Sequence, residues 1–206
     1  MLVPVREFAG AKSRLSAELG PGERADLARY CLARLLEAAM ALGPSRLVVI
    51  TRSPEVTAFA AGRGAECWEE PAEVSGLAKA CQVATETLAG PSDRVLIAMA
   101  DLPRVTGLSL ARLLDAPRAA DVVLASSASG EGTNAMVLQP GCRLTMHWGH
   151  PRSLAMHLDA ALQAGLSAQT VALPELELDL DLPDDLRQWR ESLAGPPGPH
   201  AAGSRS

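Results

Sequence analysis

Short apolar runs alternate with amphipathic stretches along most of the chain. The apolar runs predict strands at residues 2–5, 46–51, 65–68, 94–100, 121–125, 135–139 and 169–173. Apolar positions at helical spacing, bounded by Gly, Pro or Ser, predict helices at residues 23–42, 54–62, 75–88, 108–114, 151–164 and 183–193. This order favours a mostly parallel sheet with helices on both faces, so we expect one three-layer α/β domain over residues 1–193. The Pro-, Gly- and Ser-rich residues 194–206 are predicted to be a disordered tail.

The apolar run from Arg94 to Ala100 ends at the sequence Asp101-Leu102-Pro103. The run shows no polar alternation, which is typical of a strand that is buried on both faces. Ligands bind at the carboxyl ends of strands in open α/β sheets, so Asp101 is a candidate site residue. On the residues alone, a role for Asp101 as a helix cap or turn residue explains the pattern equally well.

A loop of small and basic residues follows the first predicted strand. It contains the cations Arg6, Lys12 and Arg14, with Ala11 and Ser13 between them. Small side chains let the backbone approach a ligand, and backbone N–H groups beside Lys and Arg suit phosphate oxygens. The loop has neither a Walker A pattern nor G-x-G-x-x-G, which disfavours a nicotinamide dehydrogenase and leaves an ordinary solvated basic loop as the alternative.

Two further segments are candidates for ligand contact. The helix at 75–88 is expected to begin with Ser75 as its cap, so Gly76 lies in a first turn that follows a strand. Residues 126–134 are rich in Gly and hydroxyl side chains, which suits either a ligand-binding loop or a plain hairpin connection.

Three histidines, His147, His150 and His157, lie near the start of the predicted helix 151–164. Their spacing fits neither H-E-x-x-H nor a zinc finger, so a histidine metal site is disfavoured. We favour instead a phosphate contact at the helix start, made by Ser153 with Arg152 beside it.

Residues 175–182 alternate between acids and leucines. Alternation with a period of two predicts a half-exposed strand with its acids on one face. Asp179 and Asp181 would then point to the same side, a spacing that can hold a hard cation together with a third carboxylate.

Composition narrows the classes of function. The net charge of −5 and pI near 5.4 argue against a general binder of nucleic acids or anionic membranes, which would carry a basic face. No apolar stretch is long enough to span a membrane, and residues 1–5 lead into a polar loop rather than a signal sequence, so we expect a cytoplasmic protein. The four cysteines show no C-x-x-C spacing, which suggests neither a zinc site nor a disulfide framework.

Together, the motifs P-V-x-x-F-A-G-A-K-S-R-L, A-D-L-P, G-T-N-A and L-D-L-D-L-P-D-D-L resemble those of the CofC/FbiD family. These are guanylyltransferases of coenzyme F420 biosynthesis, which join GMP to 2-phospho-L-lactate, phosphoenolpyruvate or 3-phosphoglycerate. The resemblance runs from Val3 to about Trp189. It implies a single-domain, Rossmann-like nucleotidyltransferase fold with a mostly parallel mixed sheet, similar to the molybdenum-cofactor guanylyltransferases.

The resemblance also implies roles for individual residues. The GTP site would comprise Arg6, Ala11, Lys12, Ser13, Arg14, Gly76 and Asp101, with Lys12, Arg14 and Asp101 serving catalysis. Mg²⁺ would bind to Asp101 and to Asp181, which directly precedes the Leu182-Pro183-Asp184 turn, with Asp179 as the second choice. The phosphorylated acid would be held by Thr133, Gly149, Arg152 and Ser153.

The chain departs from the family pattern at four places. Arg6 replaces a lysine, Ala78 replaces an asparagine that would help to fix the nucleoside, and Met99 replaces a proline. The turn at 149–153 is one residue longer and more cationic than the family's. A transferase with another base or acceptor, or a silent nucleotide-binding relative, therefore stays open. A homodimer and hand-over of the product to a downstream F420 transferase are further possibilities.

Overall fold

A computed structural model describes residues 1–116 and 120–194 of the chain. Its strands are β1 (Leu2–Pro4), β2 (Val48–Ile50), β3 (Glu66–Trp68), β4 (Val95–Ala98), β5 (Val122–Ser126), β6 (Thr133–Leu138) and β7 (Ala168–Val171). Its helices are η1 (Ser13–Leu15, a 3₁₀-helix), α1 (Pro21–Leu42), α2 (Pro54–Ala61), α3 (Leu77–Leu88), α4 (Gly107–Asp115), α5 (Ser153–Gln163), α6 (Pro174–Glu177) and α7 (Pro183–Ala194). The predicted tail lies, from residue 195 onward, outside the described residues.

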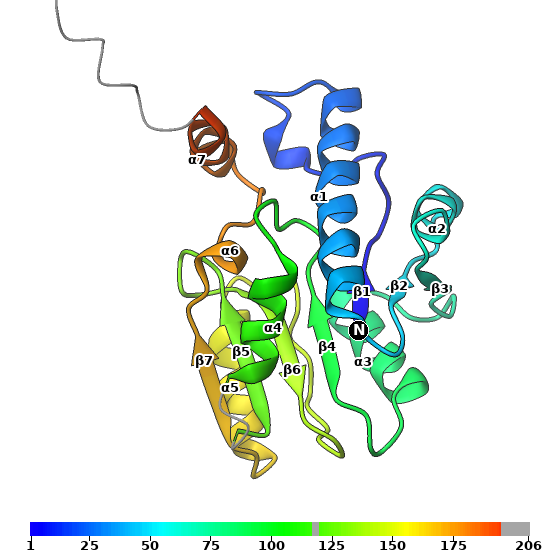
Figure 1. The fold of residues 1–206 in the computed structure, drawn as a ribbon, viewed down its shortest axis with the longest axis vertical. Coiled ribbons are helices and arrows are strands. Elements are labelled where there is room, and N and C mark those ends of the chain that lie inside the picture. Colours follow the sequence, from blue (N-terminus) through cyan, green and yellow to red (C-terminus); the bar gives the residue numbers. More distant parts are fainter. Residues whose placement is uncertain (117–119, 195–206) are drawn as a thin grey trace, which may run out of the picture.

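The strands form one mixed sheet in the order β3-β2-β1-β4-β6-β5-β7 (Figure 1). Strand β6 is antiparallel to β4 and β5, and the other neighbouring strands are parallel. The prediction of a mostly parallel mixed sheet is therefore confirmed. Because β6 runs against its neighbours, its amino end lies beside the carboxyl end of β4, where Ala135 pairs with Ala98.

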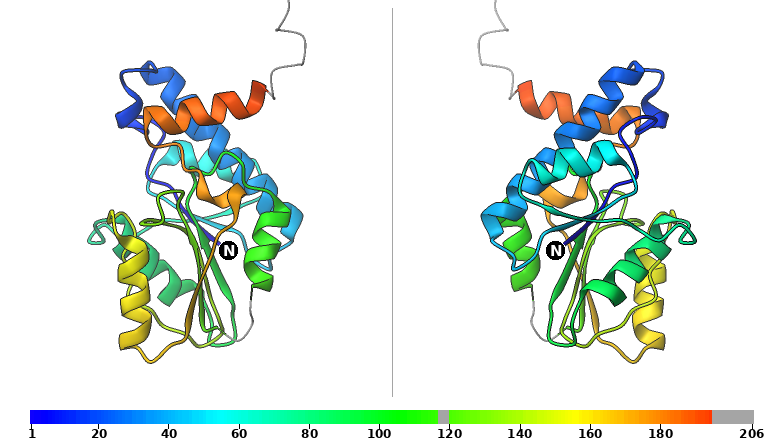
Figure 2. Two further views of the ribbon diagram at one scale, coloured as in Figure 1. Left: turned by 90° about the vertical axis from the view of Figure 1, so that its left-hand side faces the viewer. Right: turned by 90° about the vertical axis from the view of Figure 1, so that its right-hand side faces the viewer.

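Helices cover both faces of the sheet, as expected. Helices α1, α2, α4 and α6 contribute to one buried apolar cluster, and α3 and α5 contribute to the other (Figure 2). Within β4, Leu96 and Ala98 belong to the first cluster, whereas Val95 and Ile97 belong to the second. Both faces of β4 are thus dry, which explains its continuous apolar run.

Asp101 lies three residues beyond the end of β4, in the turn at the carboxyl edge of the sheet. The next helix, α4, is capped by Thr106, whose side chain accepts a hydrogen bond from the Ser109 backbone N–H at 3.0 Å. The alternative that Asp101 caps this helix is therefore wrong, and the position at a strand end is confirmed.

The predicted strand at 175–182 is wrong. Pro174 begins the short helix α6, and the residues after it are extended but pair with no strand among the described residues. The alternation is nevertheless real, because Leu176, Leu178 and Leu180 are buried while the acids between them are partly exposed. The Leu180 backbone N–H bonds to the Asp101 carbonyl at 3.1 Å, so this segment lies across the site instead of joining the sheet.

Two element boundaries also differ from the prediction. Gly76, with φ of 88°, caps α3 in place of Ser75, and no side chain bonds to this helix start. Strand β6 begins at Thr133, so Thr133 and Asn134 belong to the sheet and not to the preceding loop.

A third apolar cluster lies beyond the carboxyl edge of the sheet and joins three separate segments. It contains Leu15 of η1, Leu27 and Cys31 of α1, Leu19, Leu178 and Leu180, and Leu186 of α7, with Trp189 packed against it. In Figure 2, α7 crosses the end of α1 on this side of the molecule. This cluster holds the basic loop and the acidic segment against each other.

We predict that Leu180→Ala destabilises the protein by about 2–5 kcal/mol, because it removes a fully buried side chain from this third cluster. Leu182→Ala is the matched control: Leu182 is 49% exposed, so its loss should cost less than about 0.5 kcal/mol. Urea unfolding of both variants measures the difference. Equal losses would contradict the role given to the cluster.

Candidate active site

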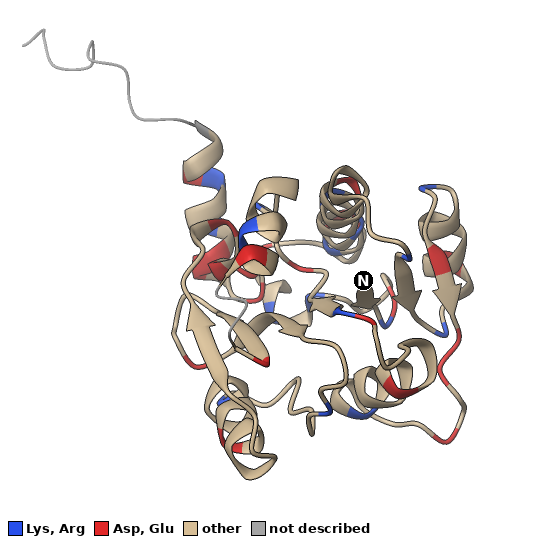
Figure 3. Cartoon of the chain, turned by 60° about the horizontal axis from the view of Figure 1, so that its bottom comes forward, with Lys and Arg blue, Asp and Glu red and all other residues tan. Residues whose placement is uncertain are grey.

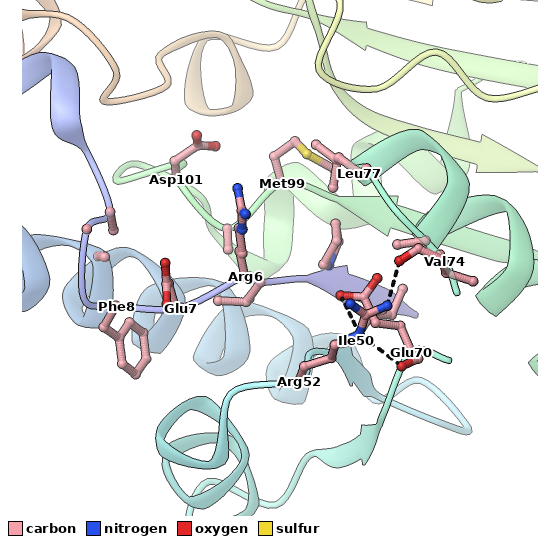
Figure 4. Close-up of a pocket in the computed structure, with 18 of the residues that line it drawn as sticks. Arg6, Glu7, Phe8, Ile50, Arg52, Glu70, Val74, Leu77, Met99 and Asp101 are labelled. Carbon is pink, nitrogen blue, oxygen red and sulfur yellow. Dashed lines mark hydrogen bonds and ion pairs between the residues drawn. The ribbon is translucent and has the colours of Figure 1, made fainter. Parts of the chain in front are cut away.

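A pocket of about 700 Å³ opens at the carboxyl ends of β1, β2 and β4 (Figure 4). Six of the residues predicted for the site line it: Arg6, Ala11, Lys12, Gly76, Asp101 and Asp181. Residues that the sequence did not single out also line it, including Glu7, Phe8, Ile50, Arg52, Glu70, Val74 and Leu77. The basic loop and the carboxylates thus share one cavity.

Lys12 and Asp101 form an ion pair, with 3.0 Å between Lys12 Nζ and Asp101 Oδ2. The Lys12 side chain is only 9% exposed, against 30% for Asp101. Burial alone would lower the pKa of the Lys12 ammonium, but the Asp101 carboxylate outweighs burial and the pKa is raised. Lys12 therefore stays charged at neutral pH and holds a fixed cation in the pocket.

The backbone of Lys12 adopts a left-handed conformation, with φ of 54°. A side chain other than glycine is strained in this region, and such strain persists only where the surroundings impose it. Here Lys12 precedes η1, whose Leu15 is fully buried in the third cluster. The strained backbone of Lys12 directs its side-chain ammonium toward Asp101.

Asp101 keeps one carboxylate oxygen free: Oδ1 is buried and has no hydrogen-bond partner among the described residues. Asp179 lies close enough to Asp101 for the two carboxylates to interact electrostatically. Burial and, secondly, the Asp101 charge raise the pKa of Asp179 to about 6. A divalent cation bound here would reduce the repulsion between the two carboxylates and would give Asp101 Oδ1 a partner.

Asn134 holds the acidic segment in place. Its side-chain amide donates to the carbonyls of Leu176 and Glu177 at 2.9 and 3.0 Å and reaches Asp179 Oδ1 at 3.5 Å. No sequence pattern indicated this role for Asn134, although the residue lies in the G-T-N-A motif.

Asp181 is paired with Arg14, whose Nη1 lies 2.6 Å from Asp181 Oδ2. Both side chains are exposed, and Arg14 and Ser13 lie outside the lining of the pocket. In residues 1–116 and 120–194, no group of three or more His, Cys, Asp or Glu side chains could hold a metal ion by itself. The three predicted metal aspartates therefore do not form a ready-made cage, and two of them contact cations instead.

Arg52 shapes the opposite wall. Its guanidinium donates to the carbonyls of Glu70, Pro71 and Val74, which fixes the loop between β3 and α3. Arg52 follows β2 by two residues, so its position after a strand end was the available signal, but no motif pointed to it.

The four residues predicted to hold the acid lie outside this pocket. Thr133 and Ser153 are both buried. They are bonded to each other, with Ser153 Oγ accepting from the Thr133 backbone N–H at 3.0 Å. Gly149 and Arg152 are exposed, and a Cβ on Gly149 would lie 3.9 Å from Leu77, which lines the pocket. The turn that contains Gly149 therefore stands next to the pocket without lining it.

His157 is a buried link between this turn and β6. The His147 backbone N–H donates to His157 Nε2 at 2.8 Å, so Nε2 accepts and Nδ1 carries the proton that faces Thr133 Oγ1 at 3.0 Å. Burial, and secondly the nearby His147, lower the pKa of His157 to about 4. His157 is thus a neutral structural side chain.

Charges of both signs are interspersed over the chain (Figure 3). Two of the three cations that line the pocket, Arg6 and Lys12, come from the loop after β1, and the third is Arg52 after β2. Within the described residues, no helix combines the length and the hydropathy needed to cross a membrane.

The fold is that of the nucleotidyltransferases. A nucleotidyl transferase from Methanothermobacter thermautotrophicus superposes with a TM-score of 0.61 at 18% identity, over 94% of this chain and 98% of that chain. A candidate nucleotide-diphospho-sugar transferase from Desulfovibrio desulfuricans G20 gives a TM-score of 0.77 at 15% identity, over 94% and 87%. A Mycobacterium tuberculosis H37Rv protein in complex with manganese gives 0.55 at 18% identity, over 93% and 98%.

Residues 1–189 match the family described as guanylyl transferase CofC like, and the chain belongs to this family. A phosphoenolpyruvate guanylyltransferase of Conexibacter woesei is 34% identical over 94% of this chain and 87% of its own length. A 2-phospho-L-lactate guanylyltransferase of Methanothermobacter thermautotrophicus is 34% identical, over 90% and 81%. A 3-phospho-D-glycerate guanylyltransferase of Phenylobacterium zucineum is 32% identical, over 89% and 86%. The resemblance found in the motifs is therefore confirmed.

The lowered pKa of His157 predicts a loss of stability in acid. Between about pH 6.5 and pH 4, His157 binds a proton in the unfolded chain but not in the folded protein. The free energy of unfolding therefore falls as the pH falls. A shift of this size corresponds to about 3 kcal/mol in total. Unfolding of the wild type and of His157→Gln at pH 7 and pH 5 measures it. A wild type that loses no more stability than the variant would refute a neutral His157.

Proposed function

We propose that this protein transfers GMP from GTP to a small phosphorylated carboxylic acid, with release of pyrophosphate, in coenzyme F420 biosynthesis. The observation that carries the proposal is the Lys12–Asp101 pair. It places a buried cation and a carboxylate with one unpartnered oxygen, Oδ1, in the same pocket. The acids named for the relatives are phosphoenolpyruvate, 2-phospho-L-lactate and 3-phosphoglycerate, and we propose one of these as the acceptor. A cytoplasmic location and product hand-over remain part of the proposal.

The proposed reaction needs no general base. A phosphate monoester has a second pKa of about 6, so the acceptor phosphate is already an anionic nucleophile at neutral pH. The remaining requirements are in-line positioning and neutralisation of charge on the α-phosphate and on the departing pyrophosphate. We assign the neutralisation to Lys12, Arg14 and Arg6.

We propose Mg²⁺ as the metal, held by Asp101 with Asp181 or Asp179. Mg²⁺ usually binds to one or two carboxylates and completes its shell with water and substrate phosphates, so a cage of three side chains is not required. The free Asp101 Oδ1 and the raised pKa of Asp179 fit such a site. When bound, the ion supplies positive charge to the phosphates of the nucleotide.

The two ion pairs suggest how the ligand-free site stays intact. Lys12 is paired with Asp101 and Arg14 with Asp181, so two of the three cations assigned to the phosphates are each matched with one carboxylate assigned to the metal. We propose that, with nucleotide bound, Lys12 and Arg14 would pair with phosphate oxygens, while Asp101 and Asp181 would hold the metal ion.

We place the acceptor on the side of Asp101 that faces β6 and α5. Gly149 and Arg152 are exposed there and are proposed to make the direct contacts. We propose that Thr133 and Ser153 complete this acceptor site. Both are buried next to Gly149 and Arg152 and are bonded to each other.

The first test is a matrix of the four ribonucleoside triphosphates against the three phosphorylated acids, with Mg²⁺, measuring pyrophosphate release. We expect release with GTP and at least one acid, because the family and the site both indicate guanylyl transfer. No release with any pair, while a nucleotide still raises the melting temperature, would favour a silent nucleotide-binding protein.

Asp101→Asn should reduce pyrophosphate release by at least about 100-fold, because it removes charge from the carboxylate assigned to the metal. The amide oxygen can still accept from Lys12, so the fold should persist with a stability loss of about 1–3 kcal/mol. Asp26→Asn is the control, since Asp26 makes an exposed pair with Arg29 on α1. Near-full activity of the Asp101 variant would refute the metal assignment.

A further inference from the structure

Glu70 is a charged residue of the pocket that the proposed chemistry does not use. Its side chain is 18% exposed, and its nearest cationic partner is Arg52, with 3.8 Å between Arg52 Nε and Glu70 Oε1. No side-chain hydrogen bond to the Glu70 carboxylate is found among the described residues, whereas Arg52 itself bonds to three carbonyls. Figure 4 shows Glu70 beside Arg52, on the wall away from Asp101.

The sheet order separates Glu70 from the phosphate end of the pocket. Glu70 follows β3 at the edge of the sheet, and Asp101 follows β4, three strand positions away, which is roughly 14 Å. A nucleoside triphosphate with its phosphates at Lys12 therefore extends its base toward the wall formed by Glu70 and Val74. The opposite orientation is disfavoured because it would move the phosphates away from Lys12 and place them beside Glu70 and Arg52, whose guanidinium already donates to three carbonyls.

The chemistry of a carboxylate that accepts no side-chain hydrogen bond from the described residues favours one base at this end. Guanine presents two adjacent donors, N1–H and the N2 amino group, and an ionised carboxylate offers two acceptor oxygens and no donor. Adenine offers an acceptor at N1, which the carboxylate would leave unpaired. Resting on the proposed function, we propose that Glu70 selects guanine by accepting hydrogen bonds from N1–H and the N2 amino group.

This assignment also accounts for Ala78. The family resemblance gives an asparagine at that position a role in fixing the nucleoside, but Ala78 packs against the second core cluster and lies outside the lining of the pocket. The neighbouring residues Gly76 and Leu77 and the loop residue Val74 do line it, on the same wall as Glu70. A carboxylate on that wall supplies the selectivity that an alanine cannot.

The test is the affinity of Mg²⁺ complexes of GTP, ITP and ATP, measured by titration calorimetry without acceptor. ITP is GTP without the N2 amino group, so the wild type should bind GTP more tightly than ITP, and ITP more tightly than ATP. Glu70→Gln should weaken GTP by about 10- to 100-fold, because one amide N–H then faces a guanine donor. It should weaken ITP less and strengthen ATP, since a glutamine amide complements adenine.

Glu69→Gln is the matched control, because Glu69 is adjacent, exposed and absent from the pocket lining. It should leave the GTP-to-ITP ratio unchanged. A Glu70 variant that weakens all three nucleotides by one factor would overturn the proposal in favour of a ribose contact or a structural role, as would a wild type that binds GTP and ITP equally. A wild type that binds no nucleotide would instead refute the proposed function itself.

Discussion

The ion pair between Lys12 and Asp101 is the interaction on which the site depends. An ammonium that is nine-tenths buried cannot remain charged without an anion, and Asp101 supplies one at 3.0 Å. The pair joins the loop after β1 to the turn after β4, two strands that are neighbours in the sheet. Because Lys12 is also in a left-handed conformation, its backbone directs the side chain toward Asp101 in the ligand-free site.

Packing, more than surface charge, positions the second pair. Arg14 and Asp181 are both exposed, and exposed ion pairs contribute little stability. Asp181 is instead placed by its neighbour Leu180, which is buried in the third cluster and whose N–H bonds to the Asp101 carbonyl. The Asn134 amide fixes the start of the same segment. Apolar packing therefore buries Asp179 close to Asp101, and its pKa is raised first by this burial and secondly by the Asp101 charge.

Local patterns revealed the sheet, the basic loop and Asp101, because each depends on residues that are close in sequence. The acid–leucine alternation failed as a strand signal because Leu178 and Leu180 are buried against η1 and α1, which are distant in the chain, and not within a sheet. The pocket positions of Glu70 and Arg52 could not be predicted for the same reason. The wall that they form exists only where the loops after β2 and β3 meet. The motif around Thr133 was recognised, yet its burial was not, since composition cannot show that Ser153 and His157 already bond to it.

The reversed direction of β6 divides the site into two sides. On the β1–β2–β3 side, strand ends and their loops form the pocket and, as proposed, hold the nucleotide. On the other side, the amino end of β6 and the turn before α5 meet, so the proposed acceptor contacts come from different elements than the nucleotide contacts. Asp101 stands between the two sides. Under the proposed assignment, changes in the turn near Gly149 would alter the choice of acceptor more than the binding of nucleotide, which suits a family whose members are named for three different phosphorylated acids.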